Sequence, residues 1–188
     1  MPKTAQKLYQ LKVTLKGSKP PIWRRFLIAS SVTLPELHGV LQVIMGWSDY
    51  HLHQFTAGGH QFGLLDSHFG LDDVTDEKGV RLDRLLVNEK DSMRYEYDFG
   101  DGWEHVILLE KVLPPEPNKS LPVCIKAKGA CPPEDVGGLW GYYNFLDVMK
   151  DQNHSEHEDV KEWIGGDFDP DAYDMELVNQ QLMAFHRP

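Results

Sequence analysis

Two runs of alternating residues joined by a glycine-rich turn place the strongest constraint on how this chain can fold. Between Met93 and Phe99 large side chains alternate with charged ones, and a second such run extends from Trp103 to Val112. Successive side chains of a strand point to opposite faces of a sheet, so each run predicts a half-buried strand. Gly100-Asp101-Gly102 between them predicts a tight turn. Part of the fold must therefore be an antiparallel hairpin.

The first half of the chain contains three further strand patterns and one helix pattern. Residues 9–16 and 23–29 predict two neighbouring strands, and residues 51–57 predict another. Between them, Thr33 and Glu36 have the spacing of a capping box, and apolar residues then recur on one helical face. The resulting order of strand, strand, helix and strand resembles the β-grasp arrangement, in which a mixed sheet wraps one helix.

The second half changes character after Pro114-Pro115. A loop-rich stretch carries the two cysteines, Cys124 and Cys131, and helix patterns follow at 142–150, 156–164 and Met175–His186. We predict the α+β class: a mixed, largely antiparallel sheet with a β-grasp-like first half, and C-terminal helices packed on it. The 188 residues suit one compact domain, so residues 1–188 are expected to form a single unit.

Charge and cysteine content exclude several classes of protein. The chain has 29 acidic and 19 basic residues, a formal charge of −10. The first 35 residues hold seven basic residues and no acid, whereas residues 134–176 hold thirteen acids and two lysines. An acidic half repels a nucleic-acid backbone, so tight nucleic-acid binding is not expected. No apolar run is long enough to span a membrane. Two cysteines make no disulfide framework and suit a reducing compartment, so we expect a cytoplasmic protein.

His51-Leu52-His53 is the first candidate for chemistry. On a strand, residues two apart share a face, so both imidazoles would lie together and could hold a divalent metal. A metal site needs at least one further ligand, and the alternative is a pair of strand-edge histidines bonded to backbone or water.

The hairpin tip is the second candidate, because it gathers three acids and a histidine: Asp98, Asp101, Glu104 and His105. A two-residue turn would place Asp98 opposite His105 and make a base-orienting pair. A three-residue turn would instead place Asp98 opposite Glu104. Two facing carboxylates repel each other, so a cation or a shared proton would be needed to stabilise them. The alternative to a functional tip is a rigid turn in which Asp101 bonds its own backbone.

The third candidate is the loop after Cys131, where two prolines precede Glu134 and Asp135 and two glycines follow them. Proline stiffens the chain and glycine allows close backbone approach, so the two acids would be held rigidly and suit a cation or an arginine. The alternative is a structural loop in which Asp135 caps the following helix. The spacing of Cys124 and Cys131 excludes a zinc site built from cysteine alone, and leaves open whether they are ligands or free thiols.

Taken together, these segments carry a family resemblance that covers about residues 8 to 180. The chain is similar to the plasmid pRi ORF-three-like family, whose members are associated with plasmids and mobile elements. The resemblance implies fold and motif identity but no particular reaction, although some members carry transposase or resolvase labels. The segments occur in this order: Pro21-Ile22-Trp23-Arg24-Arg25, Leu37-His38 with Gly46-Trp47, His51-Leu52-His53-Gln54-Phe55, Tyr97-Asp98-Phe99-Gly100-Asp101 with Trp103-Glu104-His105, Cys131-Pro132-Pro133-Glu134-Asp135-Val136-Gly137-Gly138, and Phe168-Asp169-Pro170.

Three functional hypotheses follow. The first is a binding or accessory module that recognises a protein or peptide through its sheet and aromatic residues. The second is a hydrolase-like enzyme with a carboxylate and histidine site, metal-assisted through His51 and His53. The third is a mobile-element accessory protein that contacts nucleic acid. The candidate catalytic residues are Asp98, Asp101, Glu104, His105, Glu134 and Asp135, and the candidate binding residues are Trp23, Arg24, Arg25, Trp47 and Trp103.

Overall fold

A computed structural model describes residues 7–65, 74–116 and 119–185, and within them one eight-stranded sheet organises the chain. The strand order is β5-β4-β3-β6-β7-β1-β2-β8, and all neighbours are antiparallel except β4 and β5. The strands are β1 (Leu8–Leu15), β2 (Trp23–Ala29), β3 (His53–Ala57), β4 (His60–Gly63), β5 (Val74–Asp76), β6 (Ser92–Tyr97), β7 (Trp103–Leu113) and β8 (Val123–Lys128). The helices are α1 (Leu34–Met45), α2 (Leu82–Leu85), α3 (Gly138–Lys150), α4 (His157–Ile164) and α5 (Met175–Phe185).

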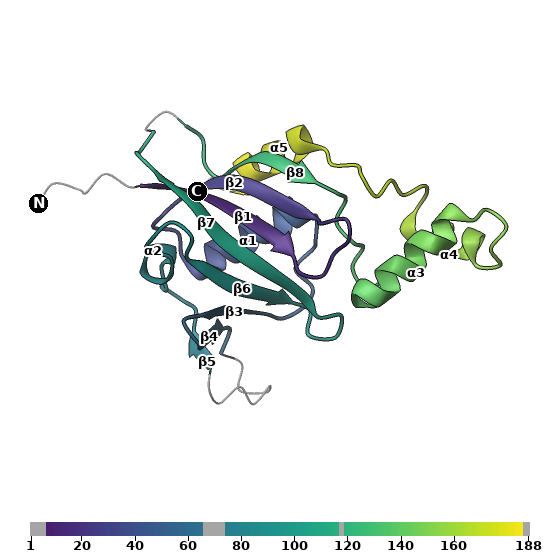
Figure 1. Cartoon of the computed structure of the whole chain (residues 1–188), viewed down its shortest axis with the longest axis horizontal. Helices are drawn as coiled ribbons and strands as arrows, with labels where there is room; N and C mark the ends of the chain where they lie inside the picture. Colours follow the sequence, from purple (N-terminus) through teal and green to yellow (C-terminus); the bar gives the residue numbers. More distant parts are fainter. Residues whose placement is uncertain (1–6, 66–73, 117–118, 186–188) are drawn as a thin grey trace, which may run out of the picture.

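Helix α1 lies against one face of the sheet and completes the hydrophobic core (Figure 1). Its start is the expected capping box, since the Glu36 carboxylate accepts the backbone N–H of Thr33 at 2.7 Å. Gly46 ends the helix in the left-handed region, with φ of 86°. The helix face and the inner side of the sheet meet in residues with no solvent exposure, among them Leu37, Leu41, Ile44, Leu11, Val13, Phe26, Phe55 and Ile107.

The α+β class with a mixed, mostly antiparallel sheet is confirmed, whereas the β-grasp-like detail is not. The strand predicted at 51–57 begins only at His53. Strands β4, β5 and β8 lie in segments where no strand was expected. Helix α5 packs against β8 and α1. Helices α3 and α4 pack on each other and extend from one end of the sheet (Figure 1). The predicted end of the last helix, His186, lies outside the described residues.

The β6–β7 hairpin has neither of the two expected registers. Tyr97 pairs with Trp103, so residues 98–102 all belong to the connection. Asp98 adopts a positive φ of 55°, and its side chain accepts the backbone N–H of Gly100 at 3.0 Å. These local bonds favour a wider turn than the glycines alone suggested. The shift places His105 opposite Tyr95 and Glu104 opposite Glu96, and it frees Asp98 from any cross-strand partner.

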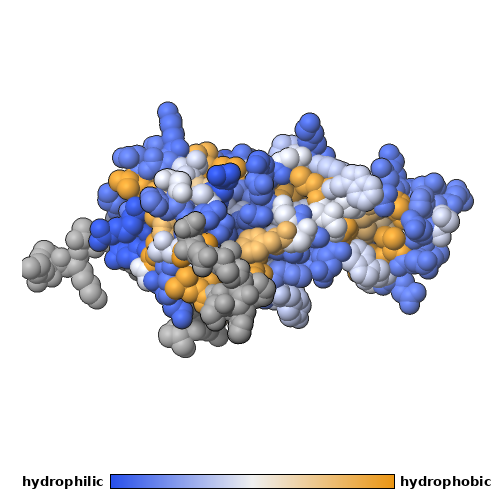
Figure 2. Space-filling model, turned by 90° about the horizontal axis from the view of Figure 1, so that it is seen from below, coloured by the Kyte–Doolittle hydropathy of each residue, from blue (hydrophilic) through white to orange (hydrophobic). Residues whose placement is uncertain are grey.

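The surface is mostly hydrophilic on the face seen in Figure 2, with smaller apolar patches between the polar groups. Within the parts of the chain that the structure describes, none of the helices has the length and apolar character needed to cross a membrane.

Candidate functional site

Three side chains from three separate segments converge at one end of the sheet: His51, Asp98 and Asp135. His51 comes just before β3, Asp98 directly follows β6, and Asp135 lies in the loop before α3. One nitrogen of His51 and one oxygen of each carboxylate all lie within 4.8 Å of one another. This is the one group of three metal-capable side chains found among the described residues.

The Nε2 atom of His51 lies close to one oxygen of each carboxylate but makes a hydrogen bond to neither. It lies 3.1 Å from Oδ1 of Asp135 and 3.6 Å from Oδ2 of Asp98. This nitrogen is shielded from solvent, yet it makes no hydrogen bond of acceptable geometry to any described residue. The short distances therefore mark a close approach of the groups rather than a directional hydrogen bond. A ring nitrogen close to two oxygens but unbonded is the arrangement that a shared cation would complete.

The backbone presents both carboxylates from strained positions. Asp98 and Asp135 have φ of 55° and 59°, in the left-handed region that Asp and Asn tolerate better than most residues. The Asp98 side chain is only 10% exposed, with one oxygen on the turn amides and the other facing His51. The Asp135 side chain is 71% exposed. The site is thus anchored on the Asp98 side and open to solvent on the Asp135 side.

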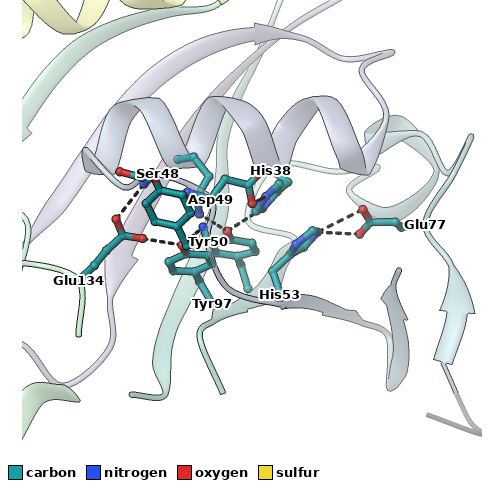
Figure 3. Close-up of polar contacts among 10 residues, drawn as sticks. His38, Ser48, Asp49, Tyr50, His53, Glu77, Tyr97 and Glu134 are labelled. Atoms are coloured by element: carbon teal, nitrogen blue, oxygen red, sulfur yellow. Dashed lines mark hydrogen bonds and ion pairs between the residues drawn. The ribbon is translucent and has the colours of Figure 1, made fainter. Parts of the chain in front are cut away.

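Glu134 does not join the three converging groups but ties their segments together (Figure 3). Its carboxylate accepts the hydroxyl of Tyr97 at 2.6 Å and the backbone N–H of Ser48 at 3.0 Å. Tyr97 directly precedes Asp98, and Ser48 belongs to the loop that carries His51. Burial, followed by the bond to Glu134, raises the pKa of the Tyr97 phenol, so this phenol stays protonated and continues to donate.

Asp101 has a similar bracing role between the hairpin tip and the start of α3. Its carboxylate accepts the backbone N–H of Gly137 at 3.1 Å. Gly138 approaches so closely that a Cβ atom there would lie 2.5 Å from the carbonyl oxygen of Asp101. The second glycine of the pair is therefore required by this contact, which holds the Asp135 loop against the hairpin.

His53 does not join His51 in the site: the strand starts only at His53, so the alternation rule does not extend back to His51, and the two side chains have different partners. Its Nε2 lies 3.0 and 3.1 Å from the two carboxylate oxygens of Glu77, which is itself 1% exposed. The His53 ring also stacks on His38, with centroids 3.5 Å apart. The structure thus divides the predicted histidine pair between an open site and the protein interior.

The comparisons with known proteins agree with this architecture. The family model described as plasmid pRiA4b ORF-3-like protein matches residues 7–177. The chain belongs to this family. A curated relative, the uncharacterized protein y4hQ of Sinorhizobium fredii (strain NBRC 101917 / NGR234), is 38% identical over 174 residues, which make up 92% of this chain and 89% of the relative.

A solved crystal structure has the same fold as this plasmid pRiA4b ORF-3-like chain. The crystal structure of a protein of unknown function, MM3350 from Methanosarcina mazei Go1, is 38% identical with a TM-score of 0.83. The match covers 92% of this chain and 98% of the other. Neither relative is named for an activity, so the chemistry has to be argued from the site itself.

Two candidate catalytic residues of this pRiA4b ORF-3-like chain lie away from the site. His105 is 1% exposed and contacts the Trp47 ring edge-on, and burial lowers the pKa of His105 to about 4. Glu104 pairs across the strands with Glu96 and forms an ion pair with Lys16 at 2.5 Å. Their placement follows from the alternation along β7, which puts His105 on the inner face with Trp103 and Ile107, and Glu104 on the outer one.

The predicted binding residues also separate. Arg24 is fully buried and donates to the carbonyl of Ile44 at 2.9 Å, so it caps the end of α1. Arg25 lies on the opposite face and forms an ion pair with Glu110 at 2.5 Å. The three tryptophans do not form one patch: Trp103 and Trp47 are buried, and Trp23 is half-buried on the outer face beside Lys12.

The cysteines are both free thiols and take no part in the site. Cys124 is buried, with its Sγ atom 3.5 Å from the hydroxyl of Tyr173. Burial raises the pKa of both Cys124 and Cys131, which keeps the thiols protonated and unreactive.

A buried polar network beside the site was not predicted. It consists of His38, Gln42, Asp49 and Tyr95, with the Glu77–His53 pair stacked against it. One signal for it was present in the sequence. His38 and Gln42 are polar residues four apart on the apolar face of α1, and such residues need partners when that face is buried.

Proposed function

We propose that this protein binds a divalent metal ion through His51, Asp98 and Asp135, and that the bound ion serves a metal-assisted hydrolase-like reaction. The observation that carries this proposal is the convergence of one imidazole nitrogen and two carboxylate oxygens within 4.8 Å. The supporting observation is that the buried His51 nitrogen makes no hydrogen bond to any described residue.

The chemistry of the ligands narrows the choice of metal. One nitrogen and two oxygens suit Mn²⁺, Fe²⁺, Co²⁺ or Zn²⁺ better than the soft metals that prefer thiolates. Three protein ligands leave coordination positions free, as in catalytic rather than structural sites, and the exposure of Asp135 leaves room for water or substrate. A metal held in this way would supply a nucleophilic water at neutral pH. Glu134 and Asp101 would hold the ligand loops in place.

The alternative functions have less support from the observed positions. A recognition surface built on tryptophans would need them together, yet Trp47 and Trp103 are buried while Trp140 on α3 is 83% exposed. Of the basic residues suited to phosphate, Arg24 is buried and Arg25 is paired with Glu110. Tight binding to nucleic acid is therefore not part of the proposal, whereas a protein or peptide partner is compatible with it. The two protonated thiols fit the cytoplasm, which we propose as the location.

Metal content of the purified protein tests the proposal. Elemental mass spectrometry should find near-stoichiometric metal in the natural chain, lost in Asp98→Asn and in His51→Gln. Asn tolerates the left-handed backbone of Asp98, so the first substitution removes charge with little strain. His60→Gln and Asp171→Asn, at exposed positions outside the site, are the matched controls and should keep the metal.

A metal-free natural chain that also fails to take up added Mn²⁺, Co²⁺ or Zn²⁺ would contradict the proposal. Metal retained in both ligand variants would contradict it equally. If metal is bound, hydrolysis of p-nitrophenyl phosphate and carboxyl esters should require the ion and be absent in Asp98→Asn.

A further inference from the structure

The buried network next to the site is a closed ring of four hydrogen bonds. The Gln42 amide donates to the Tyr95 hydroxyl at 3.0 Å, and that hydroxyl lies 2.8 Å from Nδ1 of His38. Nε2 of His38 lies 2.8 Å from Oδ1 of Asp49. The backbone N–H of Asp49 then donates to the Gln42 side-chain oxygen at 3.0 Å and closes the ring.

The chemistry of the partners fixes the direction of every bond in this ring. An ionised carboxylate can only accept, so Nε2 of His38 carries the proton that it donates to Asp49. Nδ1 of the neutral imidazole is then an acceptor, and the Tyr95 hydroxyl donates to it. The Tyr95 oxygen in turn accepts from Gln42. Burial, together with the neighbouring His53, lowers the pKa of His38 and favours this neutral form.

The ring acts on the loop that presents His51. Three successive amides of this loop each bond to a side chain from another element. The partners are Glu134 for Ser48, Gln42 for Asp49 and the Tyr97 hydroxyl for Tyr50. Asp49 has a φ of 58°, an unfavourable conformation for a non-glycine residue that the surrounding bonds must hold in place.

We infer that His38 is a positioning residue for the metal centre: through Asp49 it fixes the loop that presents His51 and thereby raises metal affinity without touching the ion. This inference rests on the proposed function. The Asp49 side chain is 60% exposed, so water could satisfy its carboxylate if His38 were absent. The bond to His38 is therefore not needed to compensate for burial of the Asp49 carboxylate. What the bond affects is the conformation of the loop.

Substitutions at His38 separate positioning from packing. His38→Leu keeps an apolar body but removes both bonds, whereas His38→Gln keeps an amide that can donate to Asp49 and accept from Tyr95. Tyr95→Phe removes the hydroxyl that bonds to both His38 and Gln42 but leaves the His38–Asp49 bond in place, which guards against a leucine variant that fails to fold. His60→Gln on the exposed strand β4 is the control.

Two measurements decide the matter. The first is hydrogen exchange in metal-free protein at the amides of Ser48, Asp49 and Tyr50, compared with amides in the β6–β7 core. The second is the dissociation constant for Mn²⁺. In His38→Leu we expect exchange at the three loop amides to rise at least about 10-fold while core protection persists, and Mn²⁺ affinity to fall about 10-fold or more. His38→Gln should restore most of both, and Tyr95→Phe should fall between the two.

Unchanged loop protection or unchanged Mn²⁺ affinity in His38→Leu would overturn the inference. So would equal losses in the leucine and glutamine variants, which would indicate a packing role alone. A natural chain that binds none of Mn²⁺, Co²⁺ and Zn²⁺ would refute the proposed metal centre and with it the effect on affinity, while hydrogen exchange would still show whether His38 orders the loop. The failure of the two proposals can thus be told apart.

Discussion

The open site and the buried ring are built from the same chemical groups and differ in how those groups are satisfied. In the open site, Nε2 of His51 approaches two carboxylates and bonds to neither. In the buried ring, both nitrogens of His38 have partners at 2.8 Å. Polar groups that converge without satisfying one another are available to a ligand, whereas groups that satisfy one another stabilise the fold. This contrast supports the proposed metal site in the first region and the proposed positioning role of the second.

His51 and His53 show how sharply the two regions are divided, since only Leu52 separates them. His53 belongs to the strand, and its partner Glu77 comes from the turn after β5. His51 lies in the loop ahead of the strand and meets the ends of two other segments. Figure 3 shows the Glu77–His53 pair at one end of the network and Glu134 at the other.

The largest expected effect is on the buried side of this comparison. Glu77→Leu removes the partner of His53 in a site that excludes water, and an unpaired buried group typically costs about 3 kcal/mol of unfolding free energy. Urea denaturation measures this cost. Glu116→Leu is the matched control, because Glu116 pairs with Lys119 at the surface and should matter by less than about 0.5 kcal/mol. A loss below about 1 kcal/mol for Glu77→Leu would remove the energetic distinction between the regions.

An acid titration should reveal the next effect on the free energy of unfolding, which comes from His105. Burial lowers the pKa of His105 to about 4, below the value of about 6.5 in an unfolded chain. Between these values only the unfolded state takes up the proton, so stability contributed by neutral His105 is complete above pH 6.5 and is lost as the pH falls toward 4. The loss should reach about 3 kcal/mol.

The control for this titration is His105→Gln, which cannot titrate. The difference in unfolding free energy between the two proteins, measured from pH 7 to pH 4, cancels the contribution of the carboxylates and of His38. A constant difference over this range would show that His105 is not held neutral by burial.

Local signals in the sequence predicted the local elements well. The capping box at Thr33 and Glu36 is formed as expected, and the strands at 23–29 and around the hairpin follow their alternation. The register of the hairpin could not be predicted, because it depends on the positive φ of Asp98 and on side-chain bonds within the turn. The observed register sets His105 opposite Tyr95 and Glu104 opposite Glu96, partners that neither expected turn length gives.

The types of residue that form the site were predicted from the sequence, but which of the candidate residues come together was not. Asp98, Asp135 and His51 were all among the candidates. Asp98 was one because the hairpin tip gathers acids, Asp135 because prolines and glycines flank its loop, and His51 because it lies two residues from His53 on a predicted strand. Which of them meet depends on where β3 begins and on how the loop before α3 returns to the hairpin, and both are properties of the tertiary structure. The partners Asp49 and Glu77 are acids in loops, with no local pattern that distinguishes them from solvated charges.

The smallest expected effect on stability is at the exposed ligand. Asp135→Asn should change the unfolding free energy by no more than about 0.5 kcal/mol, because the side chain is 71% exposed and Asn tolerates the left-handed backbone. The same substitution should abolish stoichiometric metal binding, since an amide oxygen replaces one of two anionic ligands. Urea denaturation and elemental mass spectrometry on the same sample measure both. If Asp135 contributes nothing to stability but is required to bind the ion, function lies in the open site. A large destabilisation with metal retained would instead make Asp135 part of the structural network, and the distinction between the two regions would disappear.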